Sequence, residues 1–300
     1  MQITIHSLFR TVSFALLVGA LWSSPVAAEK GCLDCHGDDM PAQTLAHRAH
    51  GQGADPRIPE GDAMCQNCHG PSDDHKAEPR KTLPDRMFGK DSNLAAEERT
   101  EVCTNCHNTG HQKNWLISEH ASDDVACDSC HNVHALKDPV QEKLTQGEVC
   151  LGCHVDQKAN ALKFSRHPIK EGIVACSDCH DPHGGKGPSM LAESTVNETC
   201  YQCHTEKRGP LLFEHEPVQD DCTNCHTPHG SVNDNMLITR APLLCQQCHI
   251  ASRHPGQNRI REDQFDPDGL GDTRLIGKSC LNCHGQVHGT NHPAGMTFRN

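Results

Sequence analysis

The chain has 300 residues, including 20 cysteines and 24 histidines, and its 39 acidic and 27 basic side chains give a formal net charge of −12. This charge argues against nucleic acid as a partner and favours docking to basic patches on other proteins. Only 3% of the residues are aromatic and the mean hydropathy is −0.63. That is too little apolar side chain for an ordinary protein core.

Residues 1–28 have the pattern of a secretory signal peptide. Arg10 supplies the positive end, "TVSFALLVGALW" is a largely apolar run, and "SSPVAA" offers small residues for cleavage after Ala28. A membrane anchor is the alternative reading, but a helix that spans a bilayer needs roughly 20 apolar residues. We expect an exported, soluble periplasmic protein that begins near Glu29 and has no segment that spans lipid.

All twenty cysteines fall in ten Cys-x-x-Cys-His motifs. This motif is the attachment signature of c-type haem, in which two thiols bond to the porphyrin and the next imidazole binds the iron. Disulfides or zinc knuckles would also use cysteines, but neither requires histidine at this fixed place. The sequence therefore predicts ten covalently bound haem c groups. The predicted attachment residues are Cys32, Cys35 and His36; Cys65, Cys68 and His69; Cys103, Cys106 and His107; Cys127, Cys130 and His131; Cys150, Cys153 and His154; Cys176, Cys179 and His180; Cys200, Cys203 and His204; Cys222, Cys225 and His226; Cys245, Cys248 and His249; Cys280, Cys283 and His284.

Ten haems leave roughly 27 residues of mature chain for each, so the porphyrins must supply the apolar core. Glycine and proline, 24 and 18 residues, divide the chain into short segments. The predicted fold is a multihaem cytochrome c that is mostly irregular, with short α-helices, little or no β-structure and an elongated stack of haems as its core. Residues 96–107 and 194–204 are candidate helices, with acidic residues near their starts.

The middle of the chain repeats every 45 to 50 residues. Cys103, Cys150, Cys200 and Cys245 follow this spacing, and each unit holds two motifs. Between the two motifs of a unit stands an isolated histidine, which is His120, His167 or His215. The second motif is extended as "CHNVH", "CHDPHG" or "CHTPHG". Such periodicity indicates units that stack in a line, each contacting its neighbours, with atypical ends.

A six-coordinate haem needs a second axial ligand. His229 lies three residues after His226, and three residues span at most about 10 Å, too little to pass from one face of a porphyrin around its rim to the other. We therefore expect His229 to serve the iron of a neighbouring haem, and likewise His134, His183 and His288. The predicted distal ligands are His50, His75, His120, His134, His167, His183, His215, His229, His254 and His288.

Other candidates for the distal position remain. His47 competes with His50, whereas His111 and His292 look surplus. Methionine is the alternative ligand type, but the methionines at 40, 64, 87, 190, 236 and 296 have no fixed relation to the motifs. Bis-histidine ligation predicts lower potentials than Met/His ligation.

The chain resembles the periplasmic decahaem cytochromes of outer-membrane porin–cytochrome conduits, the Mtr and Dms type. The likeness includes "CQNCHGPSDDH", "CSDCHDPHG" and "CLNCHGQVHGTNHPAG". It implies two pentahaem modules, residues 29–160 and 161–300, and distal ligation by the ten histidines given above. It also implies insertion into an outer-membrane porin-like β-barrel. Electrons would pass between periplasmic or inner-membrane donor cytochromes and an outer-surface multihaem cytochrome or terminal reductase.

We therefore expect an electron carrier of extracellular or anaerobic respiration rather than an enzyme. A free periplasmic electron shuttle is the first alternative. The second is a multihaem reductase of a small nitrogen or sulfur compound, which would need an iron with one open face. All ten motifs end in histidine and the distal candidates exceed ten, which favours the carrier.

Overall fold

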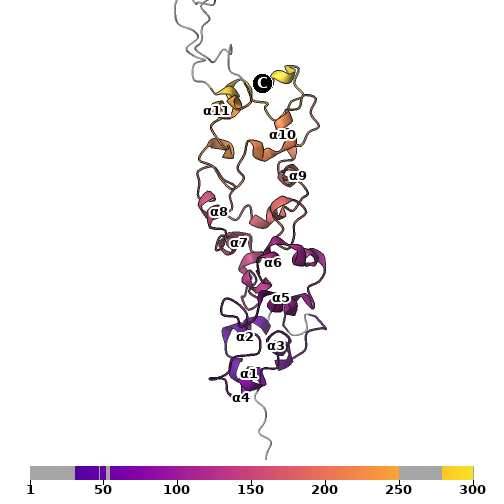
Figure 1. Cartoon of the computed structure of the whole chain (residues 1–300), viewed down its shortest axis with the longest axis vertical. Coiled ribbons are helices and arrows are strands. Elements are labelled where there is room, and N and C mark those ends of the chain that lie inside the picture. The colour runs from indigo at the N-terminus through magenta and orange to yellow at the C-terminus, as the bar shows by residue number, and fades with distance from the viewer. Residues whose placement is uncertain (1–30, 47, 52–54, 250–278, 300) are drawn as a thin grey trace, which may run out of the picture.

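A computed structural model describes residues 31–46, 48–51, 55–249 and 279–299. The predicted signal peptide and two predicted candidates, His47 and His254, lie outside the described residues. The described chain forms a rod (Figure 1). Helices α1, α2, α3 and α4 lie at one end, and α11 lies with the C-terminal residues at the other. Segments follow one another along the long axis nearly in the order of the sequence, as stacked repeats do.

The helices are short, and the longest α-helix among the described residues has nine residues. The α-helices are α1 (Cys32–His36), α2 (Met40–Ala46), α3 (Asp62–His69), α4 (Asp73–Ala77), α5 (Ala96–Thr104), α6 (Glu119–Ser122), α7 (Lys143–Cys150), α8 (Val155–Asn160), α9 (Val196–Tyr201), α10 (Glu216–Asp220) and α11 (Ala241–Gln246). The 3-10 helices are η1 (Gly110–Ile117), η2 (Cys127–Ser129), η3 (Pro139–Gln141), η4 (Cys176–Asp178), η5 (Pro188–Met190), η6 (Thr205–Lys207), η7 (Cys222–Asn224), η8 (Asp234–Met236), η9 (Cys280–Asn282) and η10 (Gly295–Thr297). Within these ranges β-structure is limited to isolated bridges such as that between Ser165 and Ser231. The predicted irregular fold with short helices is confirmed.

Both helices expected from the sequence form, and local capping explains where they begin. In α9 the hydroxyl of Thr195 accepts a hydrogen bond from the backbone N–H of Glu198 at 3.1 Å. In α5 the carboxylate of Glu98 reaches back to the N–H of Ala95 at 3.0 Å. Each of these two helices ends one residue after the first cysteine of its motif, at Thr104 in α5 and Tyr201 in α9.

Every motif contains one helical turn. The first two motifs lie on α1 and α3. In the other eight, the N–H of the motif histidine donates to the carbonyl of the first cysteine at 2.8–3.0 Å. A helical turn brings residues four apart to the same side. The first thiol and the imidazole of each motif therefore face the same way, as attachment to one porphyrin requires.

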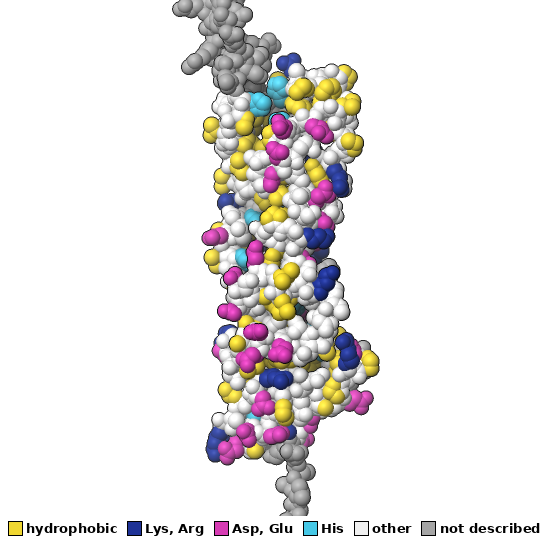
Figure 2. All heavy atoms as spheres, turned by 45° about the vertical axis from the view of Figure 1, so that its right-hand side comes forward, with side chains coloured by type: hydrophobic (Ala, Val, Ile, Leu, Met, Phe, Trp, Pro, Cys, Tyr) yellow, Lys and Arg dark blue, Asp and Glu magenta, His cyan; other side chains and the backbone are white. Residues whose placement is uncertain are grey.

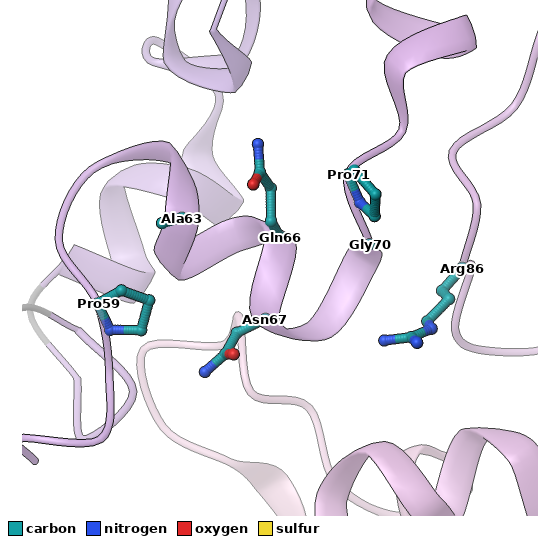
Figure 3. A pocket seen from close by; sticks show the side chains of 7 residues that line it. All are labelled: Pro59, Ala63, Gln66, Asn67, Gly70, Pro71 and Arg86. Carbon is teal, nitrogen blue, oxygen red and sulfur yellow. The ribbon is translucent and has the colours of Figure 1, made fainter.

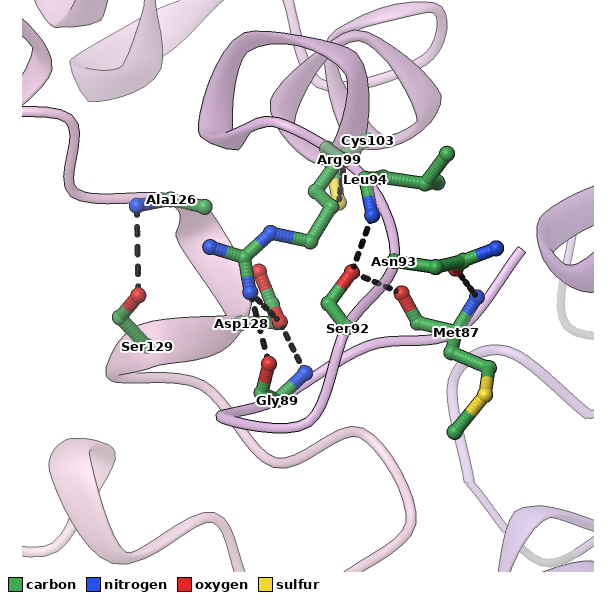
Figure 4. Close-up of polar contacts among 10 residues, drawn as sticks. All are labelled: Met87, Gly89, Ser92, Asn93, Leu94, Arg99, Cys103, Ala126, Asp128 and Ser129. Carbon is green, nitrogen blue, oxygen red and sulfur yellow. Dashed lines mark hydrogen bonds and ion pairs between the residues drawn. The ribbon is translucent and has the colours of Figure 1, made fainter.

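Successive motifs pack in pairs. α1 contacts α3, α5 contacts η2, α7 contacts η4, α9 contacts η7 and α11 contacts η9. In three pairs a side chain one turn before the first cysteine crosses to the next motif. Gln146 binds both the N–H and the hydroxyl of Ser177, and Asn197 accepts from the N–H of Cys222 at 2.8 Å. In the third pair Arg99 binds Asp128 at 3.0 Å, and both meet the backbone of Gly89 (Figure 4).

Side chains alone provide little core. Among the described residues the buried hydrophobic side chains are only Leu45, Met64, Trp115, Ala126, Ala175 and Tyr201. Large apolar side chains are instead exposed at equivalent positions, three residues before each isolated histidine: Ile117 is 83% exposed, Phe164 77% and Leu212 78%. This distribution fits the expectation that porphyrin surface supplies the core.

Candidate haem sites

The twenty cysteines all lie within the described residues, and none of them forms a disulfide. Sites are numbered 1 to 10 here in the order of their motifs. The helical segments that carry the motifs of sites 1 and 2, 3 and 4, 5 and 6, 7 and 8, and 9 and 10 contact each other. The ten motifs therefore lie in five adjacent pairs.

Nine motif histidines each face one predicted distal histidine. Their ring centroids are 5.8–6.3 Å apart. In site order the pairs are His36 with His75, His69 with His134, His107 with His50, His131 with His183, His154 with His120, His180 with His229, His204 with His167, His226 with His288, and His249 with His215. The tenth motif histidine is His284, and its predicted partner His254 is outside the described residues.

The separation of the rings fits one metal ion between them. A metal–imidazole bond is about 2 Å long, and the nitrogen lies about 1.1 Å from the ring centre, so two rings on opposite sides of one ion have centroids about 6.2 Å apart. The Nε2 atoms of His50 and His107 face each other at 3.5 Å. Burial lowers the pKa of His50, His69, His229 and His288, which favours the neutral imidazole that a metal binds.

The pairs of the repeated region follow two rules. The second motif of a unit pairs with the trailing histidine of the next unit, which is the histidine three or four residues after that unit's second motif, as His180 does with His229. The first motif of a unit pairs with the isolated histidine of the preceding unit, as His204 does with His167. These sites are therefore completed by a neighbouring unit. The motif histidine and the trailing histidine three residues later point to different partners, as the short tether between them requires.

The Nδ1 atom of each isolated histidine is hydrogen-bonded to a backbone carbonyl. His120, His167 and His215 donate to the carbonyls of Pro182, Pro228 and Val287 at 3.1, 2.9 and 2.9 Å. These carbonyls immediately precede the trailing histidines of the same part of the rod. Such bonds fix the tautomer and the ring orientation, and leave Nε2 for the metal.

Carboxylates near four of the paired rings were not anticipated from the sequence. Asp39 binds Nδ1 of His36 at 2.6 Å and Asp138 binds Nδ1 of His131 at 2.7 Å. Asp181 lies 3.6 Å from Nδ1 of His183, and Glu206 lies 3.9 Å from Nδ1 of His204. The only signal was an acidic residue within seven positions of a histidine, which is too common to be informative.

The surplus candidates behave differently from the paired ones. His292 accepts a hydrogen bond at Nδ1 from the N–H of Ala294 at 3.1 Å, which is a local turn contact. His111 lies in η1. The predicted competitor His47 is outside the described residues, whereas His50 faces His107.

Figure 2 shows acidic and basic side chains interspersed over one face, with histidines visible in the gaps between segments. One hollow of about 470 Å³ opens beside α3 (Figure 3), and no cysteine or histidine is among its lining residues. Its lining residues are Pro59, Ala63, Gln66, Asn67, Gly70, Pro71 and Arg86. In the part of the chain that the structure describes, no helix is both long and apolar enough to cross a membrane.

Comparisons with known proteins agree with this arrangement. Residues 167–209 and 215–254 match the doubled CXXCH motif, and residues 65–145 match the NrfB-like c-type cytochromes. The chain is 46% identical over 277 residues to the multihaem cytochrome MtrA of Shewanella baltica, which is 92% of this chain and 82% of that protein. It is 32% identical over 97 residues to the c-type cytochrome NrfB of Escherichia coli, which is 28% of this chain and 51% of that protein.

Proposed function

Because the chain belongs to the multihaem c-type cytochromes of the MtrA type, which carry electrons through covalently bound haem c, we propose that it holds ten haems and conducts electrons along the whole rod. Each haem is held by the two cysteines of its motif and lies between the motif histidine and a second histidine. The proposed second ligands, from site 1 to site 10, are His75, His134, His50, His183, His120, His229, His167, His288, His215 and His254.

The protein's own residues meet the needs of such sites. The thiols would hold the porphyrin covalently, the paired imidazoles would bind its iron, and the carbonyls at Nδ1 would keep the rings in place. Haem iron supplies a one-electron couple, which two histidine ligands set at low potential compared with Met/His ligation. Two imidazoles leave no axial position for a substrate, which supports a carrier and not a reductase.

The observation that carries the proposal is the series of facing histidine pairs along the long axis. Trailing histidines join each even-numbered site to the next, and each odd-numbered motif packs against an even-numbered one. Electron transfer over the length of a rod requires that each site lie close to the next, without a gap. The pair His131 and His183 continues this series across residues 160 and 161, the proposed boundary between two modules of five sites. We propose that the modules, residues 29–160 and 161–300, work as one conductor.

We further propose that the protein is exported to the periplasm by residues 1–28 and inserted into an outer-membrane porin-like β-barrel. The narrow rod and the mixed charge of its surface support a protein sheath around it, with donor cytochromes at one end. The acceptor would be an outer-surface multihaem cytochrome or a terminal reductase.

Purification of the tagged protein from detergent-extracted outer membranes tests this proposal. We expect a β-barrel protein to co-purify in a fixed ratio, and the complex in sealed vesicles to reduce an enclosed dye from an external reductant. Recovery only from the periplasmic fraction, without a barrel, would reject the conduit and favour the free shuttle.

A further inference from the structure

Site 4 differs from the other sites of the repeated region in the partner of its motif histidine. Nδ1 of His131 donates to the carboxylate of Asp138 at 2.7 Å. The other carboxylate oxygen accepts from the N–H of Asn132 at 3.2 Å. The side chain of Asp138 is only 5% exposed, and its ion pair among the described residues is with His131. A carboxylate so shielded from water keeps most of its electrostatic effect on the ring.

The equivalent sites of the next two units provide an internal comparison. Seven residues after the motif histidine, where site 4 has Asp138, site 6 has Gly187 and site 8 has Asn233. In these two sites Nδ1 of the motif histidine donates instead to a backbone carbonyl, that of Ser189 at 2.9 Å or that of Asn235 at 2.8 Å. The group that accepts from Nδ1 of the motif histidine is therefore neutral in sites 6 and 8 and negatively charged in site 4.

The second ring of site 4 also lies near a carboxylate. His183 faces His131 with an angle of 9° between the ring planes, and its Nδ1 is 3.6 Å from the carboxylate of Asp181. The equivalent residues of the other two units are Asn132 and Thr227, which carry no charge. Both rings of site 4 therefore have an anionic neighbour.

We propose that Asp138 is a positioning residue that makes site 4 a low-potential step in the conductor. This inference rests on the proposed ligation of the haem iron by His131 and His183. A buried anion at Nδ1 strengthens electron donation from the imidazole and stabilises ferric over ferrous iron, because the ferric form carries one more positive charge. Electrons crossing between the two proposed modules would pass over this step.

Anaerobic redox titration of the purified holoprotein, followed at the absorbance of reduced haem, tests the role of Asp138. In the Asp138→Asn variant, which keeps the size of the side chain and an oxygen acceptor, we expect about one-tenth of the absorbance change to move to higher potential. The reduction equilibrium of that fraction should change at least tenfold, or about 59 mV for one electron. The other nine-tenths should follow the parent curve.

Asp39→Asn is the matched control, because Asp39 also binds a motif histidine but both side chains are more than half exposed. Water screens that charge, so we expect a change of about twofold or less. Superimposable curves for the parent and Asp138→Asn, or an equally large change in Asp39→Asn, would overturn the proposal. Haem content and the low-spin spectrum, measured in the same samples, show that the variants are folded.

The underlying ligation is tested separately with His183→Ala. We expect a high-spin ferric component from one site. If this component is present while Asp138→Asn titrates like the parent, the ligation stands and only the role of Asp138 is rejected. If His183→Ala remains fully low-spin, the proposed ligation of site 4 is rejected.

Discussion

The repeated region, residues 103–249, and the N-terminal region, residues 31–95, reach the same histidine pairing by different local structure. In the repeated region each isolated histidine donates to the carbonyl that precedes a trailing histidine, and this contact recurs three times. In the N-terminal region the motifs lie inside α1 and α3, and the Nδ1 partners come from a nearby loop, such as the carbonyl of Thr82 for His75.

The separation of the two histidine rings therefore varies less between the regions than the backbone structure around them. The ring centroids are 6.3 Å apart for His36 and His75 and 6.0 Å apart for His180 and His229. Only the second pair belongs to the repeat. The separation is thus nearly the same whether a repeat or an irregular loop supplies the second histidine.

Removal of haem should have the largest effect, because it abolishes both regions. Buried apolar side chains are few throughout the described chain, so the polypeptide alone cannot offset the entropy of folding. We expect the unmatured chain to be disordered. Circular dichroism during thermal denaturation measures this, and a cooperative transition with the native helical signal would contradict it.

Removal of one distal ligand in the repeated region should affect one site in ten. In His229→Ala the partner His180 loses its facing ring, and we expect about one-tenth of the ferric haem to become high-spin. Absorbance and electron paramagnetic resonance spectroscopy measure this fraction. His292→Ala should remain low-spin. A high-spin signal of equal size in His292→Ala would show that the pairing has been misassigned.

The same test in the N-terminal region decides between two adjacent candidates. His50 faces His107 at 3.5 Å between the Nε2 atoms, so His50→Ala should give a high-spin component. His47→Ala should leave the spectrum unchanged. The reverse result would assign site 3 to His47 and would break the comparison between the two regions.

Loss of a polar link between motifs should have the smallest effect. Asn197 binds the carbonyls of Val218 and Gln219 and the N–H of Cys222, and its loss leaves buried groups without partners. We expect Asn197→Ala to lower the free energy of unfolding by about 1–3 kcal/mol, measured with guanidinium. Gln202→Ala, at an exposed position of the same motif, is the control. Equal midpoints for the two variants would show that the link contributes nothing.

The sequence predicted the fold class because every cysteine belongs to a Cys-x-x-Cys-His motif. Short helices begin at capping residues such as Thr195. The sequence also predicted that His229 and His226 serve different sites, since this depends only on how far three residues can reach. It could not assign the partner of each distal histidine. That choice depends on contacts between units some 50 residues apart, and His50 and His75 lie outside the repeat. The carboxylate at His131 could not be predicted, because the equivalent positions of the other units are Gly187 and Asn233, and the motif histidines there bind backbone carbonyls.

We expect every haem to lie between two histidines and none to have an open face. A spin count by electron paramagnetic resonance on the ferric holoprotein, with its haem content determined by mass spectrometry, measures this. We expect ten haems per chain, all low-spin. Fewer than ten haems, or a stoichiometric high-spin component in the parent protein, would contradict it.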